Sequence, residues 1–125
     1  MADVTLPTRK RGESLIFTAT LAITADRAGT PTVIDDLAGW DPICQFARTP
    51  GDDDRIEWTL LGIDGQAITF GLPNATSAGM AEGFYGEIVL QDPEAPAGFG
   101  ETRWPGAGSY LRYTSAQNVA VRASS

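Results

Sequence analysis

The sequence predicts an all-β domain: an antiparallel β-sandwich of about seven short strands with one short helical turn. Several segments alternate apolar and polar residues, the pattern of a strand with one buried face. The 14 glycines and 8 prolines are spread along the whole chain, so turns punctuate it throughout. No segment shows the strand–helix alternation of a parallel sheet.

Residues 14–24 form the clearest ladder in the sequence and predict the first strand. One face carries only apolar side chains: Leu15, Phe17, Ala19, Leu21 and Ile23. Threonines dominate the other face, which is the composition of a strand that packs on one side and meets water on the other.

Residues 55–63 and 66–72 predict a hairpin, because Asp64-Gly65 is a two-residue turn signal between alternating segments. Further strands are expected over residues 43–48, 84–90, 101–104 and 109–114, with 118–122 as an extension of the last, and a final hairpin turns around 105–108. Residues 26–32 and 49–54 read as turns. A helical turn within 73–82 could be capped by Asn74, Thr76 or Ser77 and is limited by Gly79 and Gly83. We expect Phe17, Trp58, Phe70 and Ile88 to point inward.

A chain of 125 residues is long enough for one core, so residues 1–125 are expected to form a single β-sandwich domain. Residues 1–12 read as a basic N-terminal arm, and 91–108 as a long loop rich in glycine and proline. The first residues lack the apolar segment of a secretory signal, and no run of about 18 apolar residues predicts a membrane span.

Charge and composition narrow the classes of function. The net charge of −7 favours solubility and disfavours nucleic acid as a partner. The chain contains no histidine, which removes the usual general base and most zinc constellations. Its single cysteine, Cys44, lies in an apolar stretch and is expected to be a buried, inert thiol.

Two acidic patterns could carry chemistry, but each has a plainer interpretation. Asp52, Asp53 and Asp54 could hold calcium, although consecutive carboxylates cannot all face one ion and the spaced calcium-loop pattern is missing. A glycosidase pair could come from carboxylates near loop edges: Glu82, Glu87, Asp92, Glu94 and Glu101. We expect solvated carboxylates in both cases, and therefore no catalytic residue, no metal and no cofactor.

The remaining candidates are a basic cluster and a set of aromatic residues. Arg9, Lys10 and Arg11 are either solvated or a contact for an acidic neighbouring subunit. Aromatic side chains at alternating positions usually fill a sandwich core, whereas exposed ones can bind sugar. The candidates for sugar binding are Trp104, Tyr110 and Tyr113.

The order of these segments resembles that of small phage structural domains, of which the N-terminal domain of siphophage upper baseplate proteins is the best-known relative. The resemblance rests on "RGESLIFTATL", "DLAGW…ICQFAR", "AITFGLPNATSAGMAEGFYGEIVLQD" and "SYLRYTSAQNVAVR". It covers most of residues 8–122 as a pattern. Two features depart from it: the segment 91–108 is long, and Glu13 stands where aspartate is commoner.

The resemblance implies an immunoglobulin-like sandwich that serves as a non-enzymatic structural protein of a bacteriophage virion. As an adaptor in the tail, baseplate or neck it would bind other virion proteins, a fibre or copies of itself after assembly in the host cytoplasm. The expected contacts are Arg9, Lys10, Arg11, Phe99, Arg103 and Trp104. Two alternatives stay open: a decoration protein on the phage head, and a carbohydrate-binding module for a host glycan.

Overall fold

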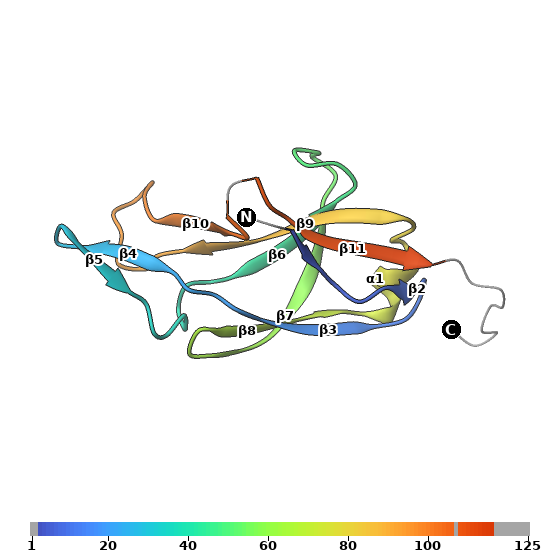
Figure 1. Ribbon diagram of the computed structural model, residues 1–125, viewed down its shortest axis with the longest axis horizontal. Coiled ribbons are helices and arrows are strands. Elements are labelled where there is room, and N and C mark those ends of the chain that lie inside the picture. The colour runs from blue at the N-terminus through green and yellow to red at the C-terminus, as the bar shows by residue number, and fades with distance from the viewer. Residues whose placement is uncertain (1–2, 107, 117–125) are drawn as a thin grey trace.

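The computed structural model describes residues 3–106 and 108–116 and confirms that the chain is an all-β protein (Figure 1). The strands, in chain order, are β1 (Val4–Thr5), β2 (Arg9–Lys10), β3 (Leu15–Thr20), β4 (Thr24–Arg27), β5 (Thr30–Val33), β6 (Ile43–Ala47), β7 (Ile56–Asp64), β8 (Ala67–Leu72), β9 (Gly83–Gln91), β10 (Glu101–Trp104) and β11 (Leu111–Ala116). The one helix within these ranges is α1 (Asn74–Ala78). The predicted extension over 118–122 lies outside the described residues. No helix in the described part of the chain is long and apolar enough to cross a membrane.

Nine of these strands form one mixed sheet, in which the main path runs β1-β11-β9-β6-β7-β8-β3. The sheet curls because β7 belongs to both of its halves. Residues 56–58 of β7 pair with β6, and residues from Thr59 onward pair with β8, with a register shift between Leu60 and Gly62. As a result β3 and β8 lie across from β9 and β11 in Figure 1, and the side chains between them form the core.

An aromatic cluster joins the two halves of the curled sheet. The indole of Trp58 on β7 stacks on Phe46 of β6 with ring centroids 4.2 Å apart, and it meets Tyr113 of β11 edge-on at 5.4 Å. Phe17 of β3 approaches the same indole at 5.8 Å. The predicted inward positions are confirmed, since Trp58, Phe70 and Ile88 are fully buried and Phe17 packs half-buried against them.

The N-terminal residues are part of the sheet, so the predicted basic arm over 1–12 is wrong for the residues that the structure describes. β1 and β2 both pair in parallel with β11, with Val4 opposite Leu111 and Arg9 opposite Ser115. Leu6, between them, is only 6% exposed. The three cations suggested a solvated segment. The apolar residues before them, Val4 and Leu6, instead pack against the core and keep this segment on the sheet.

Residues 26–32 form most of a hairpin, not the simple turn that the sequence predicted. β4 and β5 pair in an antiparallel register around Ala28-Gly29, and both turn residues have positive φ, 54° and 84°. This is the geometry of a two-residue hairpin turn. The hairpin projects from the body, at the left in Figure 1. Ala25 packs against the core but Val33 is 61% exposed, so the two short strands carry no apolar ladder.

The predicted hairpin around 105–108 is also wrong. β10 and β11 do not pair with each other: both pair with β9, Trp104 opposite Ile88 and Leu111 opposite Gly86. They are consecutive segments along one edge of β9, and the true hairpin joins β9 to β10 through residues 92–100. The predicted loop 91–108 is therefore not a continuous loop. Its first residue, Gln91, is the last residue of β9, and residues 101–104 form β10.

The helical turn is confirmed, but its predicted caps are not. Pro73 occupies the N-cap position without a side-chain hydrogen bond, and Gly79 ends the helix. The hydroxyl of Ser77 instead accepts a hydrogen bond from the Gly12 backbone at 3.1 Å. Arg11 donates to the carbonyl of Ala78 at 2.7 Å, so the basic cluster is fastened to α1.

Candidate functional site

An open groove lies between the β4–β5 hairpin and the loop 92–100. Its volume is about 640 Å³, and the buried indole of Trp40 forms part of its floor. One wall consists of residues 24–29 of the hairpin, and the other of loop residues that include Glu94, Pro96 and Phe99. Both walls lie at the end of the molecule opposite β2 and α1 (Figure 1).

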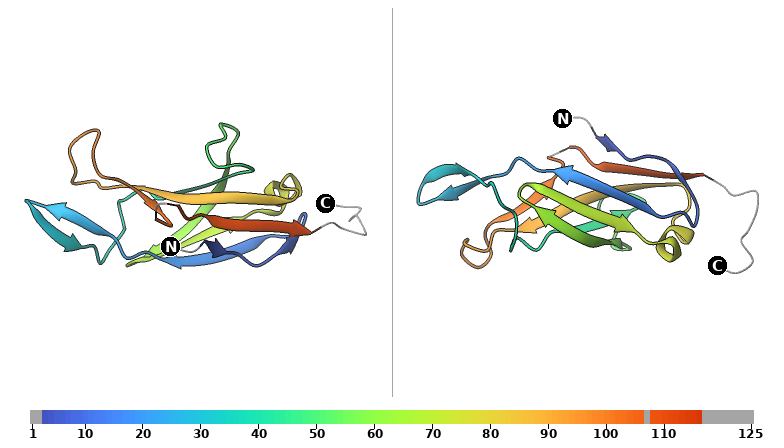
Figure 2. Two further views of the ribbon diagram at one scale, coloured as in Figure 1. Left: turned by 45° about the horizontal axis from the view of Figure 1, so that its top comes forward. Right: turned by 90° about the horizontal axis from the view of Figure 1, so that it is seen from below.

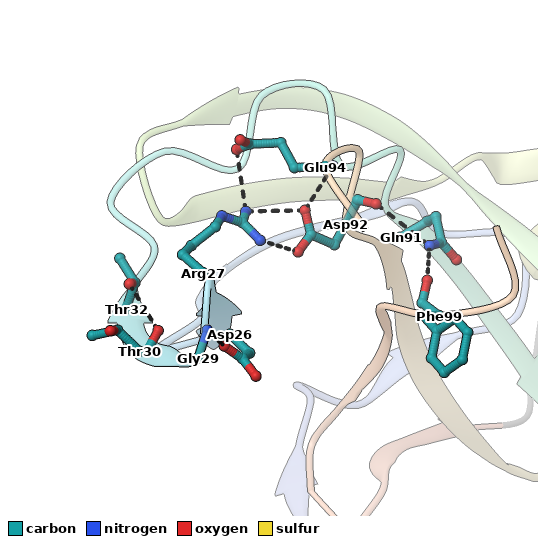
Figure 3. Close-up of polar contacts among 9 residues, drawn as sticks. All are labelled: Asp26, Arg27, Gly29, Thr30, Thr32, Gln91, Asp92, Glu94 and Phe99. Carbon is teal, nitrogen blue, oxygen red and sulfur yellow. Dashed lines mark hydrogen bonds and ion pairs between the residues drawn. The ribbon is translucent and has the colours of Figure 1, made fainter. Parts of the chain in front are cut away.

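An arginine–carboxylate pair connects the two walls, as Figure 3 shows. The guanidinium of Arg27 on β4 donates to both oxygens of Asp92, with Nη2 to Oδ1 at 3.0 Å, and also reaches Glu94 at 3.3 Å. Asp92 is 5% exposed and further accepts a hydrogen bond from the Glu94 backbone at 2.9 Å. Such a two-pronged contact fixes orientation as well as distance, so the hairpin and the loop are held at a defined spacing.

The hydrogen bonds between Arg27 and Asp92 also affect the pKa values of these two groups. The hydrogen bonds from Arg27 lower the pKa of Asp92, although burial of the carboxyl acts in the opposite direction. The hydrogen bond to Asp92 likewise raises the pKa of Arg27. Both groups therefore stay charged at neutral pH, and Asp92 acts as an acceptor rather than as a proton donor.

The loop that carries Phe99 is closed by its own backbone. The Asp92 amide donates to the carbonyl of Gly100 at 3.0 Å, and the side-chain amide of Gln91 donates to the carbonyl of Phe99. Gly100 has a φ of +85°, and a Cβ there would lie 2.5 Å from that of Ala95, so this close approach needs glycine. The ring of Phe99 is nevertheless 66% exposed. The loop thus presents an aromatic side chain on a fixed backbone.

The other carboxylates proposed for a glycosidase pair also face arginine. Glu82 pairs with Arg48 at 3.0 Å, and Arg103 contacts Glu87 at 3.5 Å and Glu101 at 3.3 Å. These carboxylates are therefore engaged in ion pairs with arginine. Within residues 3–106 and 108–116, no three acidic or cysteine side chains are grouped to hold a metal ion.

The acidic turn and the cysteine have local roles. Asp52, Asp53 and Asp54 are exposed, and the Asp52 carboxylate accepts a hydrogen bond from the Asp54 amide at 3.1 Å. Cys44 is fully buried on β6, where burial raises the pKa of its thiol and the nearby charge of Glu57 adds to the effect. Burial of this thiol, as predicted, is confirmed.

The structure separates the predicted contact residues instead of gathering them into one surface. Phe99 lines the groove, whereas Arg103 lines a small hollow of about 50 Å³ beside Tyr85 and Tyr110 on the outer face of β9. Trp104 is half-buried against the core. Arg9, Lys10 and Arg11 lie at the far end of the molecule, beside α1 (Figure 1).

The set predicted for sugar binding is wrong at Tyr113, which is fully buried in the aromatic cluster and cannot meet a ligand. Tyr110 is half-buried and packs edge-on against Tyr85, with ring centroids 5.7 Å apart. Trp104 is half-buried as well. The structure therefore offers no row of exposed rings at these three positions.

Sequence reasoning missed Arg27 and the pairing role of Asp92. They lie 65 residues apart, and neither belongs to a motif. The available signal was an arginine placed before an Ala-Gly turn signal and an Asp-Pro step after a strand, but no local pattern indicates that the two meet. No family model matches the sequence, and no curated protein is significantly similar to it.

Proposed function

We propose that this protein is a non-enzymatic structural component of a bacteriophage virion, an adaptor in the tail, baseplate or neck. In this proposal the curled sheet is an immunoglobulin-like sandwich, and the end that carries the groove contacts a neighbouring subunit or a fibre. The proposal combines the resemblance in the sequence with the surface that the β4–β5 hairpin and the loop 92–100 form together.

One observation carries the proposal: Phe99 is 66% exposed on a loop whose backbone is held by hydrogen bonds on both sides of the ring. Aromatic side chains anchor protein interfaces when they enter a pocket on the partner. Binding through a fixed loop avoids most of the entropy that ordering a mobile loop would cost. The exposed ring is thus suited to dock into a partner protein.

The rest of the surface supports a role that depends on architecture. Each carboxylate of the proposed catalytic pairs faces an arginine, and the thiol of Cys44 is buried. A net charge of −7 keeps a protein soluble at the high concentrations that assembly from many copies needs. These features suit a rigid module that is made in quantity and then packed against neighbours.

The test is incorporation of chain variants into particles that are purified away from unassembled protein. Replacing Phe99 with serine is expected to lower the amount of chain per particle at least tenfold, because the anchor is lost. Val33→Ser serves as the matched control, since Val33 is 61% exposed on the β4–β5 hairpin, across the groove from Phe99, but does not line the groove. Equal incorporation of both variants would refute the proposed contact, and thermal melting of each variant shows that it is folded.

A further inference from the structure

Strand β3 lies at one end of the main sheet path, so only one of its two edges is paired within the described residues (Figure 2). The Leu21 amide, just after the strand, donates to Gln66 beside β8 at 3.0 Å. Backbone groups alternate between the two edges of an antiparallel strand. Hence the odd-numbered residues face β8, and the N–H and C=O groups of Ile16, Thr18 and Thr20 face away from it.

This edge has none of the features by which proteins usually block pairing with another chain. Natural sheets protect edge strands with charged side chains, prolines or bulges. Residues 14–25 contain no charged side chain and no proline, and β3 pairs with β8 without a register shift. The open edge is therefore six regular residues long, enough for a stable strand addition.

The outer face beside this edge is also uncharged over β3 and the adjoining positions of β8. Thr18 and Thr69 share a hydrogen bond of 2.9 Å between their hydroxyls, and Ile16 is 65% exposed. Leu61 lies over Gly71, where a Cβ would come within 2.9 Å of its Cδ1. In a chain with a net charge of −7, this is a surface that two copies can bring together without like-charge repulsion.

We propose that the β3 edge pairs in an antiparallel register with β3 of a second copy, around a twofold axis at Thr18. Thr18 then lies opposite the partner's Thr18, and Ile16 lies opposite the partner's Thr20. Every outward N–H and C=O group of these residues gains a partner, and the two curled sheets become continuous. The inference adds a second contact surface to the proposed function and deepens it by naming a partner.

The charges near the two ends of β3 favour a second copy of this chain as the partner that pairs with its open edge. The chain enters β3 from Arg9, Lys10 and Arg11, and this end stays net positive with Glu13 included. At the other end of the strand, the Leu37 amide donates to the Gly65 carbonyl and the Gln66 side chain donates to the Ile34 carbonyl. These bonds bring the 34–37 segment to the β7–β8 turn, where the exposed carboxylates are those of Asp35, Asp36 and Asp64. Antiparallel pairing places the basic end of each copy beside the acidic end of the other, twice around the axis.

Sedimentation equilibrium of the full chain over a range of concentrations tests the inference without any particle. We expect a monomer–dimer equilibrium whose dissociation constant rises at least tenfold in Thr18→Lys, because two lysines would face each other across the axis. Thr69→Lys is the matched control: it adds the same charge on the same face and loses the same hydroxyl contact, but one strand inside the edge. Its dissociation constant should stay within about threefold of the parent value.

Amide hydrogen exchange gives a second readout on the unmodified chain. The amides of Ile16, Thr18 and Thr20 should exchange quickly in dilute solution and slowly at high concentration, whereas those of Phe17 and Ala19 should be protected at both. A chain that stays monomeric at millimolar concentration would overturn the inference, as would a dimer that Thr18→Lys leaves intact. Either result would leave the proposed function standing if Phe99→Ser still reduces incorporation.

Discussion

The aromatic cluster makes a quantitative prediction about one glycine. Gly86 on β9 faces the ring of Phe46, and a Cβ built there would lie 2.4 Å from Cε2 and 2.6 Å from two further ring carbons. Ordinary contact begins at 3.4 Å, so the ring or the strand must move by about 1 Å. The ring has little room to move, because it is fully buried and stacked on Trp58.

We therefore expect Gly86→Ala to lower the free energy of unfolding by about 2–3 kcal/mol, the upper part of the usual range for overpacking a core. In a domain of this size that corresponds to a fall in Tm of roughly 8–12 °C. Urea unfolding followed by tryptophan fluorescence measures the change, and Trp58 reports directly on the disturbed stack.

Gly83→Ala is the control for this experiment. Gly83 lies on the same strand, but a Cβ there would meet nothing closer than a backbone oxygen at 3.9 Å, so the variant should be within about 0.5 kcal/mol of the parent. Phe46→Leu removes the ring carbons that a Cβ at position 86 would meet. In that background Gly86→Ala should lower the free energy of unfolding much less, which a double-mutant cycle measures. Equal stability of the two alanine variants would refute the packing described for Phe46.

Three further predictions concern other parts of the fold. Leu6→Ala should lower the free energy of unfolding by about 2–4 kcal/mol, because Leu6 is buried. Deletion of residues 1–11 should lower it at least as much, because β1 and β2 pair with β11. An unchanged Tm in either variant would contradict this. The pKa of Asp92 is lowered from 3.8 by Arg27, so its contribution to stability is present above about pH 4 and lost as the pH falls below it. The stability difference between the parent and Asp92→Asn should accordingly shrink as the pH falls below about 4, and a constant difference would show that the pair does not stabilise the fold. Cys44 should react with a thiol reagent only at the rate of unfolding, because burial raises its pKa; fast labelling of the folded chain would show that β6 is not covered.

Strands with one buried face could be predicted from the sequence because their alternation is local. The ladder from Leu15 predicted β3, although the strand ends at Thr20 and not at residue 24. The hairpin of β7 and β8 was also predicted, but its turn is Gly65-Gln66, one residue after the expected Asp64-Gly65. Burial of Trp58 and Phe70 imposes the local period of two that made both visible. The β4–β5 hairpin could not be recognised in this way, since its strands are four residues long and Ala25 is the apolar residue of β4 that packs against the core. The turn residues around 105–108 indicate that the chain turns there, but they do not indicate which strands pair. The pairing of both β10 and β11 with β9 therefore could not be predicted from them.

The candidate site was predicted only in part. Phe99 could be singled out because an aromatic residue among glycine and proline is unusual in a loop, and it lies on the groove. Arg27 and Asp92 could not be connected, because a contact across 65 residues leaves no periodic trace. The basic cluster at Arg9–Arg11 was seen correctly as charge but wrongly as an arm, since its attachment depends on Leu6 and on α1 rather than on the cations themselves.

The most direct test of a structural role is the copy number of this chain in purified phage particles, determined by quantitative mass spectrometry and located by electron cryo-microscopy. We expect a fixed number of copies per particle, arranged with the symmetry of the tail, baseplate or neck, with Phe99 at a boundary between subunits. Particles that are complete and infectious but contain none of this chain would contradict the account.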